Sequence, residues 1–282
     1  MRKIIYILII SLQFTSCEDV IEVDLKSAQP RLVIDASLNW FKETQGNNQY
    51  IRLTLSAPFF DNTVPPANGA TVIVTDLNNN TFSFIEEENT GLYINNSFIP
   101  VIDGVYNLTI TYNNETYTAS EKLMPVSTID YVEQKNKGGF SGDETEIKAY
   151  YTDPEGIDNY YFFEFINTTT KVQSLEAYDD EFTDGNQIFA FFSDENLTTG
   201  AKIIIKSYGI SKQFYEFISL LLQQTNDESG DPFELQPATV RGNCVNQTNP
   251  ENYPLGYFKA SEVSVLNYTI EWFFLSGIIF VF

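Results

Sequence analysis

The sequence contains no histidine, and this absence restricts its chemistry more than any other feature of the composition. Histidine is the general base of Ser-His-Asp and Cys-His nucleophiles and a common ligand of zinc, so these kinds of site are excluded. Catalysis by paired carboxylates stays open as one hypothesis, because such hydrolases need no histidine. The composition favours the simpler interpretation that the protein is not an enzyme.

Basic residues are scarce as well. The 282 residues include 16 Lys and Arg against 38 Asp and Glu, which gives a formal net charge of -22. Such a chain repels phosphate backbones, so nucleic acid is excluded as a partner. It also lacks the basic patch that would hold it on anionic lipid headgroups. Any attachment to a membrane is therefore expected to be covalent or mediated by another protein.

Only two cysteines occur, Cys17 and Cys244. One interpretation pairs them in a disulfide, as is usual in an oxidising compartment. The other takes Cys17 as the first residue of a mature protein that is held to a membrane by lipid. Under the second interpretation Cys244 has no partner within the chain, and we expect it to be a small buried hydrophobe.

The start of the chain favours the lipid anchor. Arg2 and Lys3 are followed by an apolar run over residues 4–14, then by Thr15 and Ser16 directly before the cysteine. This is the layout of a secretory signal peptide, and the run is too short for a transmembrane helix. Small residues followed by cysteine resemble the lipobox of bacterial lipoproteins, although a phenylalanine occupies the usual aliphatic position.

We therefore predict a signal peptide over residues 1–16 and a lipidated N-terminus and tether over residues 17–30. In such lipoproteins the thiol, here that of Cys17, is diacylated with fatty acids such as palmitate. The acidic pair Glu18 and Asp19 suits a solvated tether better than a strand. The predicted location is the cell outer membrane, with the protein anchored by lipid. Both the periplasmic face and the cell surface stay open as the side on which it lies.

Residues 31–123 consist mostly of short segments in which apolar and polar residues alternate, as in β-strands. Turn sequences separate these segments. Two hairpins are predicted, one with its turn at residues 77–80 and one with its tip at residues 113–114. Tyr106 lies in a sequence that resembles the tyrosine corner, in which the hydroxyl bonds back to nearby backbone. Together these patterns predict an immunoglobulin-like β-sandwich.

Residues 124–282 are predicted to form a second β-rich domain with one packed α-helix. Ser211 is a good N-cap, and apolar residues at helical spacing follow it, which predicts a helix over 211–224. The fold class is therefore mostly β. The apolar stretch 272–282 is too short for a helical membrane span. Two interpretations stay open for it: a buried terminal strand, or a strand that resembles the last one of an outer-membrane barrel.

Two stretches concentrate acidic side chains that could bind calcium, which prefers oxygen ligands. The spacing differs from that of an EF-hand, and solvated loops are the simpler interpretation. No cofactor is predicted. The candidate ligands are Asp179, Asp180, Glu181 and Asp184 in the first stretch, and Asp153, Glu155 and Asp158 in the second.

Aromatic residues make up 15% of the chain. Exposed aromatic rings such as that of Trp40 would suit stacking on sugars, and core packing is the simpler interpretation of any single ring. A stand-alone adhesin or glycan-binding module is therefore kept as an alternative function.

Several pieces of the sequence occur in one fixed order: PRLVIDASL, IRLTLSAPFFD, GATVIVTD, GLY, DGVYNLTI, YTASEKL, SKQFYEFISLLLQQ, DPFELQPATVRGNCVN and LGYFKAS. Together they resemble the Bacteroidota lipoprotein family catalogued as domain of unknown function 4249. The resemblance covers residues 17–261 and implies an outer-membrane lipoprotein, often encoded beside a TonB-dependent transporter. It brings no known catalytic residues. The function it implies is that of a non-enzymatic accessory or binding protein of such a transporter.

Overall fold

Most of the protein consists of β-strands in which apolar side chains alternate with others. The computed structural model describes residues 29–58, 61, 63–139, 142–225 and 240–271. The predicted signal peptide, Cys17 and the apolar stretch 272–282 lie outside these residues. The first strands are β1 (Leu32–Phe41), β2 (Gln49–Leu55), β3 (Thr71–Asp76), β4 (Thr81–Glu86), β5 (Leu92–Asn95), β6 (Val105–Tyr112) and β7 (Glu115–Lys122). Next come β8 (Ile129–Gly138), β9 (Glu144–Thr152), β10 (Tyr160–Asn167), β11 (Gln173–Asp179), β12 (Gln187–Asp194) and β13 (Lys202–Gly209). Helix α2 (Lys212–Thr225), β14 (Val245–Asn246) and β15 (Leu255–Thr269) complete the order.

Both predicted hairpins form. β3 pairs antiparallel with β4, and the Asp76 carboxylate orders the turn between them by accepting the amides of Asn78 and Asn80, each at 2.9 Å. β6 pairs antiparallel with β7, and Asn113 and Asn114 at the tip both have positive φ, at 48° and 63°. Asparagine tolerates this left-handed conformation, which explains why local sequence predicts both turns.

The tyrosine corner is confirmed. The Tyr106 side chain is 1% exposed, and its hydroxyl accepts the Val101 amide at 2.8 Å and donates to the Ile99 carbonyl at 3.1 Å. Its ring contacts that of Phe98, at a centroid distance of 4.9 Å. The tyrosine hydroxyl thus bonds to two backbone groups at the corner before β6, as expected of an immunoglobulin-like sandwich.

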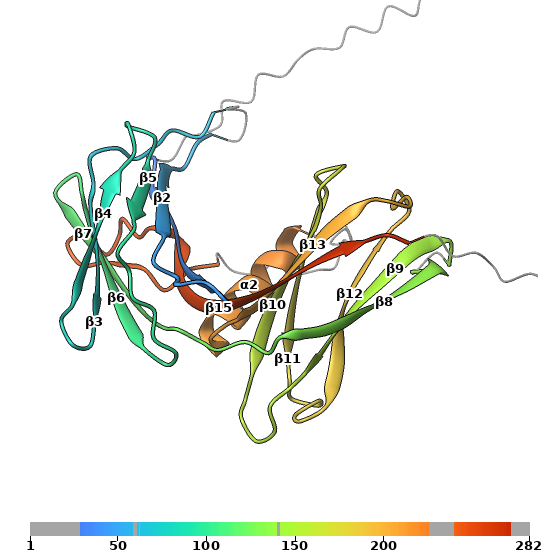
Figure 1. Cartoon of the computed structure of the whole chain (residues 1–282). Helices are drawn as coiled ribbons and strands as arrows, with labels where there is room; N and C mark the ends of the chain where they lie inside the picture. The colour runs from blue at the N-terminus through green and yellow to red at the C-terminus, as the bar shows by residue number, and fades with distance from the viewer. Residues whose placement is uncertain (1–28, 59–60, 62, 140–141, 226–239, 272–282) are drawn as a thin grey trace, which may run out of the picture.

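Two lobes share one large sheet (Figure 1). The order in this sheet is β11-β10-β13-β15-β1-β2-β5-β4-β3-β6-β7-β14, and a separate sheet has the order β12-β9-β8. The first lobe contains the strands from β2 to β7, and the second contains those from β8 to β13. β15 runs from one lobe to the other, as the long red strand in Figure 1 shows.

β15 joins the lobes because its two halves pair with different strands. Its first half lies parallel to β1, in a register that runs from Val33 opposite Leu255 to Phe41 opposite Val263. Its second half pairs antiparallel with β13, up to Lys202 opposite Thr269. The first and last strands of the described chain therefore lie side by side in the middle of the large sheet.

Three groups of buried side chains hold the fold together. The first core fills the first lobe and includes Cys244, Phe258 and Ala260 from the late part of the chain. The second core fills the space between the two sheets of the second lobe. The helix cluster packs α2 against the large sheet, with Phe214 and Ile218 buried. Residues from both predicted halves of the chain therefore contribute to the first core.

Strand β10 shows how α2 is placed. Tyr161, Phe163 and Phe165 belong to the second core, while Phe162 belongs to the helix cluster. Because alternate side chains of a strand point to opposite faces, α2 covers the face of the large sheet that lies away from the three-stranded sheet. This double coverage explains why β10 is apolar almost throughout.

The predicted helix forms, and the Ser211 hydroxyl caps it by accepting the Phe214 amide at 3.2 Å. The helix has 14 residues. In the described part of the chain, no helix is both long enough and apolar enough to cross a membrane.

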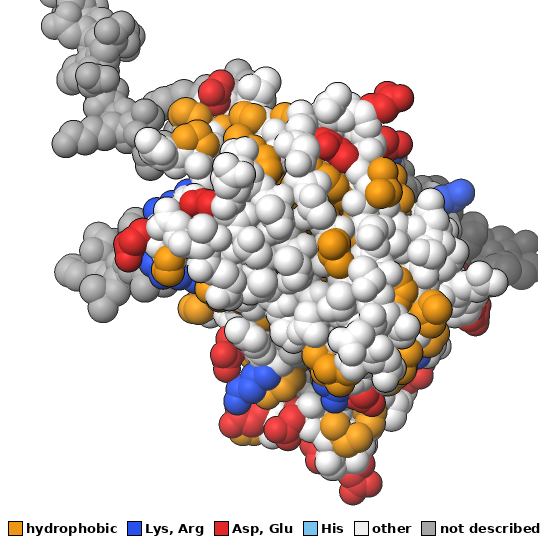
Figure 2. All heavy atoms as spheres, turned by 90° about the vertical axis from the view of Figure 1, so that its left-hand side faces the viewer, with side chains coloured by type: hydrophobic (Ala, Val, Ile, Leu, Met, Phe, Trp, Pro, Cys, Tyr) orange, Lys and Arg blue, Asp and Glu red, His pale blue; other side chains and the backbone are white. Residues whose placement is uncertain are grey.

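Figure 2 shows the outer face of the first lobe. Acidic side chains are most frequent around its margin, and the hydrophobic ones form small separate groups. Exposed apolar residues in this lobe include Leu77 and Ile85, at 71% and 70%. Scattered exposure of this kind is ordinary on a protein surface and gives no argument for a binding site there.

Candidate functional site

Two acidic loops meet at one end of the second lobe. Asp153 follows β9, while Asp180 and Asp184 lie in the loop between β11 and β12. One carboxylate oxygen from each of the three lies within 4.8 Å of the others. The sequence suggested two separate acidic stretches, and the structure brings together one residue from the second stretch with two from the first.

Asp153 is the most enclosed of the three, with 2% exposure. It accepts a hydrogen bond from the Tyr161 hydroxyl at 2.6 Å and another from the Gly185 amide at 3.1 Å. These two hydrogen bonds satisfy polar atoms that are buried away from water. Asp153 therefore ties the second core to the loop after β11.

The other two carboxylates bind the neighbouring loop in the same way. Asp180 accepts the Asn159 amide at 2.7 Å, and Asp184 accepts the Gly156 amide at 2.8 Å. These contacts hold the loops together through charge-assisted bonds. Three carboxylates at this spacing also present the oxygen ligands that calcium prefers.

The remaining candidate calcium ligands lie elsewhere. Asp179 accepts the Tyr215 hydroxyl of α2 at 2.7 Å. Asp158 and Glu181 line a hollow of about 350 Å³ at the start of α2, and Glu155 is exposed. The full lining of this acidic hollow is Asp158, Tyr160, Asp179, Asp180, Glu181, Lys212, Tyr215 and Glu216.

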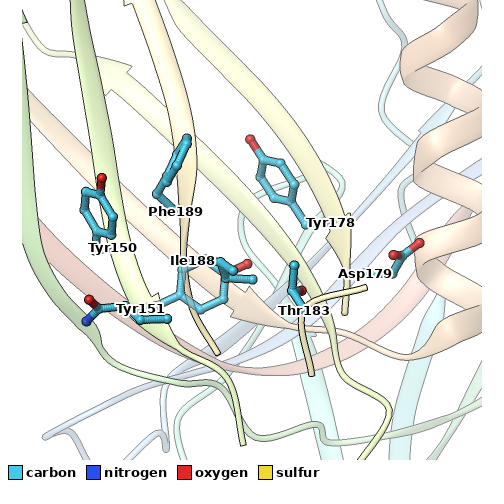
Figure 3. A pocket seen from close by; sticks show the side chains of 8 residues that line it. Tyr150, Tyr151, Tyr178, Asp179, Thr183, Ile188 and Phe189 are labelled. Carbon is cyan, nitrogen blue, oxygen red and sulfur yellow. The ribbon is translucent and has the colours of Figure 1, made fainter. Parts of the chain in front are cut away.

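A second hollow, which we call the aromatic hollow, opens beside the first where the edge strands β11 and β12 approach each other. It has a volume of about 360 Å³. Figure 3 shows the rings of Phe189 and Tyr178 rising on either side, with Tyr151, Ile188 and Thr183 between them at the base in this view. The complete lining is Tyr150, Tyr151, Tyr178, Asp179, Thr183, Gln187, Ile188 and Phe189.

Sequence reasoning did not single out the aromatic hollow. The signal available was the alternation of apolar and aromatic residues in IKAYY and QIFAFF, which is also the pattern of any half-buried strand. Tyr150 and Phe189 point away from the core while their neighbours Tyr151 and Ile188 point toward it. The combination into one hollow depends on which edges meet, and this is a tertiary property.

Two other residues considered in the sequence are structural in this molecule. Cys244 lies in the first core and has no disulfide partner among the described residues. Burial raises the pKa of its thiol to about 12, so as a thiol it stays protonated at neutral pH. Trp40 packs against the same core, and its indole nitrogen donates to the Thr44 carbonyl at 3.0 Å. Trp40 therefore serves packing, as the simpler interpretation held.

Lys259 lies on β15 beside the helix cluster. Its ammonium donates to the Asn39 side-chain oxygen at 2.8 Å and lies 4.4 Å from the centre of the Tyr208 ring. Burial lowers its pKa to about 8, and the negative charges of Asp35 and Glu164 only partly oppose this effect. Among the ion pairs formed within the described residues, none includes Lys259.

The lowered pKa of Lys259 predicts that the stability of the protein depends on pH. Its pKa is lower in the folded than in the unfolded chain, so the unfolded chain binds more protons between pH 8 and 10. The free energy of unfolding should therefore rise across this range, by about 2 kcal/mol in total from pH 7 to 10. Lys259→Met should be more stable than wild type at pH 7 and should lose most of this advantage at pH 10, as measured by urea unfolding.

The control for this experiment is Lys202→Met, which removes an exposed lysine from the neighbouring strand β13. It should leave the slope of stability against pH unchanged. Equal slopes in wild type and Lys259→Met would show that burial does not depress the pKa of Lys259.

Taken together, these features define a mostly β protein with two lobes, a shared sheet, one covering helix and two small hollows at the end of the second lobe. The chain belongs to the family described as domain of unknown function DUF4249, whose sequence profile matches residues 18–266. No curated protein matches the chain.

Three solved structures have some likeness to this chain. A two-domain fibronectin type III segment of chicken tenascin has 9% identity and a TM-score of 0.22, with 64% of this chain and 90% of the other covered. A DUF4785 family protein of Legionella pneumophila has 7% identity and a TM-score of 0.26, with 63% and 52% covered. The chicken interferon gamma receptor alpha chain has 11% identity and a TM-score of 0.21, with 64% and 88% covered. At these scores the likeness carries no argument about function.

Proposed function

We propose that this protein is a lipid-anchored lipoprotein of the cell envelope, of the kind found in Bacteroidota, that binds a ligand or partner without catalysing a reaction. The observation that carries the proposal is the sequence from Met1 to Cys17, with its positive start, its apolar run and its small residues before the cysteine. A β-rich body follows shortly after this anchor, with its first strand beginning at Leu32.

The end of the second lobe suits a binding role. Its loops are held by hydrogen bonds between Asp153, Asp180 and Asp184 and the amides of the opposing loops, so they form an ordered frame. Binding residues are commonly found on loops positioned by a rigid scaffold. The acidic and aromatic hollows lie side by side in this frame and share Asp179.

We further propose that the protein acts as an accessory of a TonB-dependent outer-membrane transporter, with its lipid anchor holding it in the same membrane. The alternative function is a surface adhesin or glycan-binding module that works alone. The aromatic hollow favours a role in ligand capture under either proposal. Purification of the full chain after cross-linking in its own host separates them, because only the accessory role requires a transporter among the cross-linked partners.

The anchor predicts the result of a single substitution. Wild-type protein extracted from membranes should have an intact mass that corresponds to a chain beginning at Cys17 with acyl groups attached. Cys17→Ala should abolish this species and move the protein out of the membrane fraction, because the acylated thiol is missing. Intact-mass spectrometry of both proteins, expressed in a related host, measures the difference.

Cys244→Ala is the matched control, because it removes the other cysteine. This variant should keep the acylated species and its place in the membrane fraction. A soluble wild-type chain that loses a disulfide in both variants would instead show that Cys17 pairs with Cys244, and it would overturn the proposed anchor and location.

A further inference from the structure

Two arginines stack on one tyrosine beside the start of β1. The guanidinium carbon of Arg31 lies 3.7 Å from the centre of the Tyr253 ring, and that of Arg241 lies 3.9 Å from the same point. Two flat guanidinium groups so close to one ring centre would overlap on a single face, so they cover opposite faces of the ring. We call Arg31 and Arg241 the arginine pair.

The fold holds this arrangement from three distant parts of the chain. The Nη1 atom of Arg31 donates to the carbonyls of Glu251 and Tyr253, at 3.2 and 3.0 Å. Arg241 is exposed, and it precedes Cys244, which is buried in the first core. Tyr253 itself lies just before β15. The positions of all three side chains are therefore set by the packing of the first lobe and the shared sheet.

Neither arginine has an acidic partner among the described residues. Ion pairs form there between other side chains, and none of them includes Arg31 or Arg241. The chain has 38 acidic residues against 16 basic ones, so a shortage of carboxylates does not explain this. Two unpaired positive charges at one place in so acidic a protein are suited to a negative group that comes from elsewhere.

Stacking leaves the hydrogen-bond donors of both groups available. A guanidinium carries five N–H donors around its edge, while the ring covers only its flat face. Arg31 uses its Nη1 atom for the two carbonyls, and Arg241 donates to no described residue. The remaining N–H groups form the forks that bind oxyanions through paired, charge-assisted hydrogen bonds.

The placement of the two forks favours phosphate over carboxylate. A carboxylate has two oxygens, and one guanidinium fork can occupy both of them. A phosphate group carries oxygens that point in several directions, so it can accept from two forks that lie on opposite faces of one ring. Two arginines are too few for the polybasic patch that holds a protein on an anionic membrane, which limits the site to a single group.

We propose that the arginine pair binds one phosphate group, which belongs either to a soluble phosphate ester or to a lipid headgroup. This inference goes beyond the proposed function and does not require the lipid anchor. If the anchor is present, a headgroup beside it is within reach, because Arg31 lies 14 residues after Cys17. An extended chain of that length spans up to about 50 Å.

The test measures binding to the full chain in maltoside micelles, which contain no phosphate. Glycerol 3-phosphate is added in one arm, and phosphatidic acid is mixed into the micelles in the other, with phosphorus NMR and calorimetry as readouts. At least one of them should bind with a Kd of about 1 mM or tighter, and acetate about tenfold more weakly. Binding of glycerol 3-phosphate identifies a soluble ester as a sufficient ligand, whereas binding of phosphatidic acid alone identifies a headgroup. No binding in either arm, or equal binding of acetate, overturns the proposal.

Three variants locate the phosphate group. Arg241→Ala should weaken binding about tenfold, and Arg241→Lys should restore only part of it, because an ammonium keeps the charge and lacks the fork. Arg52→Ala is the matched control, since Arg52 is an exposed arginine on β2 and its loss changes the net charge equally. Thermal unfolding checks that each variant is folded. Equal affinities of Arg241→Ala and Arg52→Ala would overturn the assignment of phosphate to the arginine pair.

Discussion

A fragment that consists of residues 31–123 alone will fail to fold cooperatively. In the structure β1 has β2 on one side and β15 on the other, so the fragment loses the entire parallel ladder from Val33 to Phe41. It also loses Phe258, which is 0% exposed and belongs to the first core. Circular dichroism during urea titration should show a broad, non-cooperative change for this fragment and a single sharp transition for residues 29–271.

Substitution of Phe258 tests the same dependence within the full chain. Phe258→Ala should lower the free energy of unfolding by about 3–5 kcal/mol, the usual cost of removing a buried phenylalanine. Val265→Ala is the control, since Val265 lies on the same strand and is 43% exposed, and it should cost much less. A cooperative transition in the isolated fragment, together with a small effect of Phe258→Ala, would show that the first lobe is independent of β15.

The second large effect is expected from Gly256→Ala. Gly256 lies opposite Ile34 in the parallel ladder and has a φ of +87°, which alanine rarely adopts. An added Cβ atom would lie 2.1 Å from the Ile34 carbonyl oxygen, so the backbone of β1 or β15 would have to move. The strain and the displacement together should cost about 4 kcal/mol in the free energy of unfolding.

Gly200→Ala provides the matched control for this effect. Gly200 has a similar φ of +84°, but no atom lies within 4 Å of the position of an added Cβ. This variant therefore measures the backbone strain alone, which should be about 1–2 kcal/mol. Thermal and urea unfolding of the two variants separate the cost of backbone strain from the cost of displacing β1 or β15. Equal losses in both would mean that the close approach of Gly256 to β1 is unimportant for stability.

The sequence predicts correctly those parts of the fold that depend on contacts between residues close together in the chain. The turns at Asn113 and Asn114, the Tyr106 corner and the Ser211 cap each depend on contacts within a few residues, and all three formed. Strand β8 was missed because most of its side chains are exposed and polar, so it lacks an apolar alternation.

The pairing of distant strands was beyond such reasoning. β9 and β10 are consecutive, yet they belong to different sheets, and nothing in the turn between them indicates this. The same holds for the parallel pairing of β1 with β15. The acidic cluster depends on how the two sheets of the second lobe are placed. The sequence therefore suggested Asp153 and Asp180 as members of separate sites.

The candidate hollow illustrates the same limit at the level of single atoms. Sequence can show that Tyr151 lies on a half-buried strand, but an unpaired hydroxyl becomes visible only when all of its neighbours are placed. Its ring contacts Tyr161 and Phe163, at centroid distances of 4.7 and 5.2 Å. A phenylalanine would make these contacts equally well, so the sequence alone gives no reason to notice the hydroxyl.

The position of β15 also governs when folding can be completed. Val33 pairs with Leu255, so the middle of the large sheet closes only after most of the chain has been synthesised. Contacts between residues so far apart raise the contact order and slow folding, because the long intervening loop must be ordered first. An emerging chain therefore lacks its central ladder until β15, the last described strand, has been synthesised.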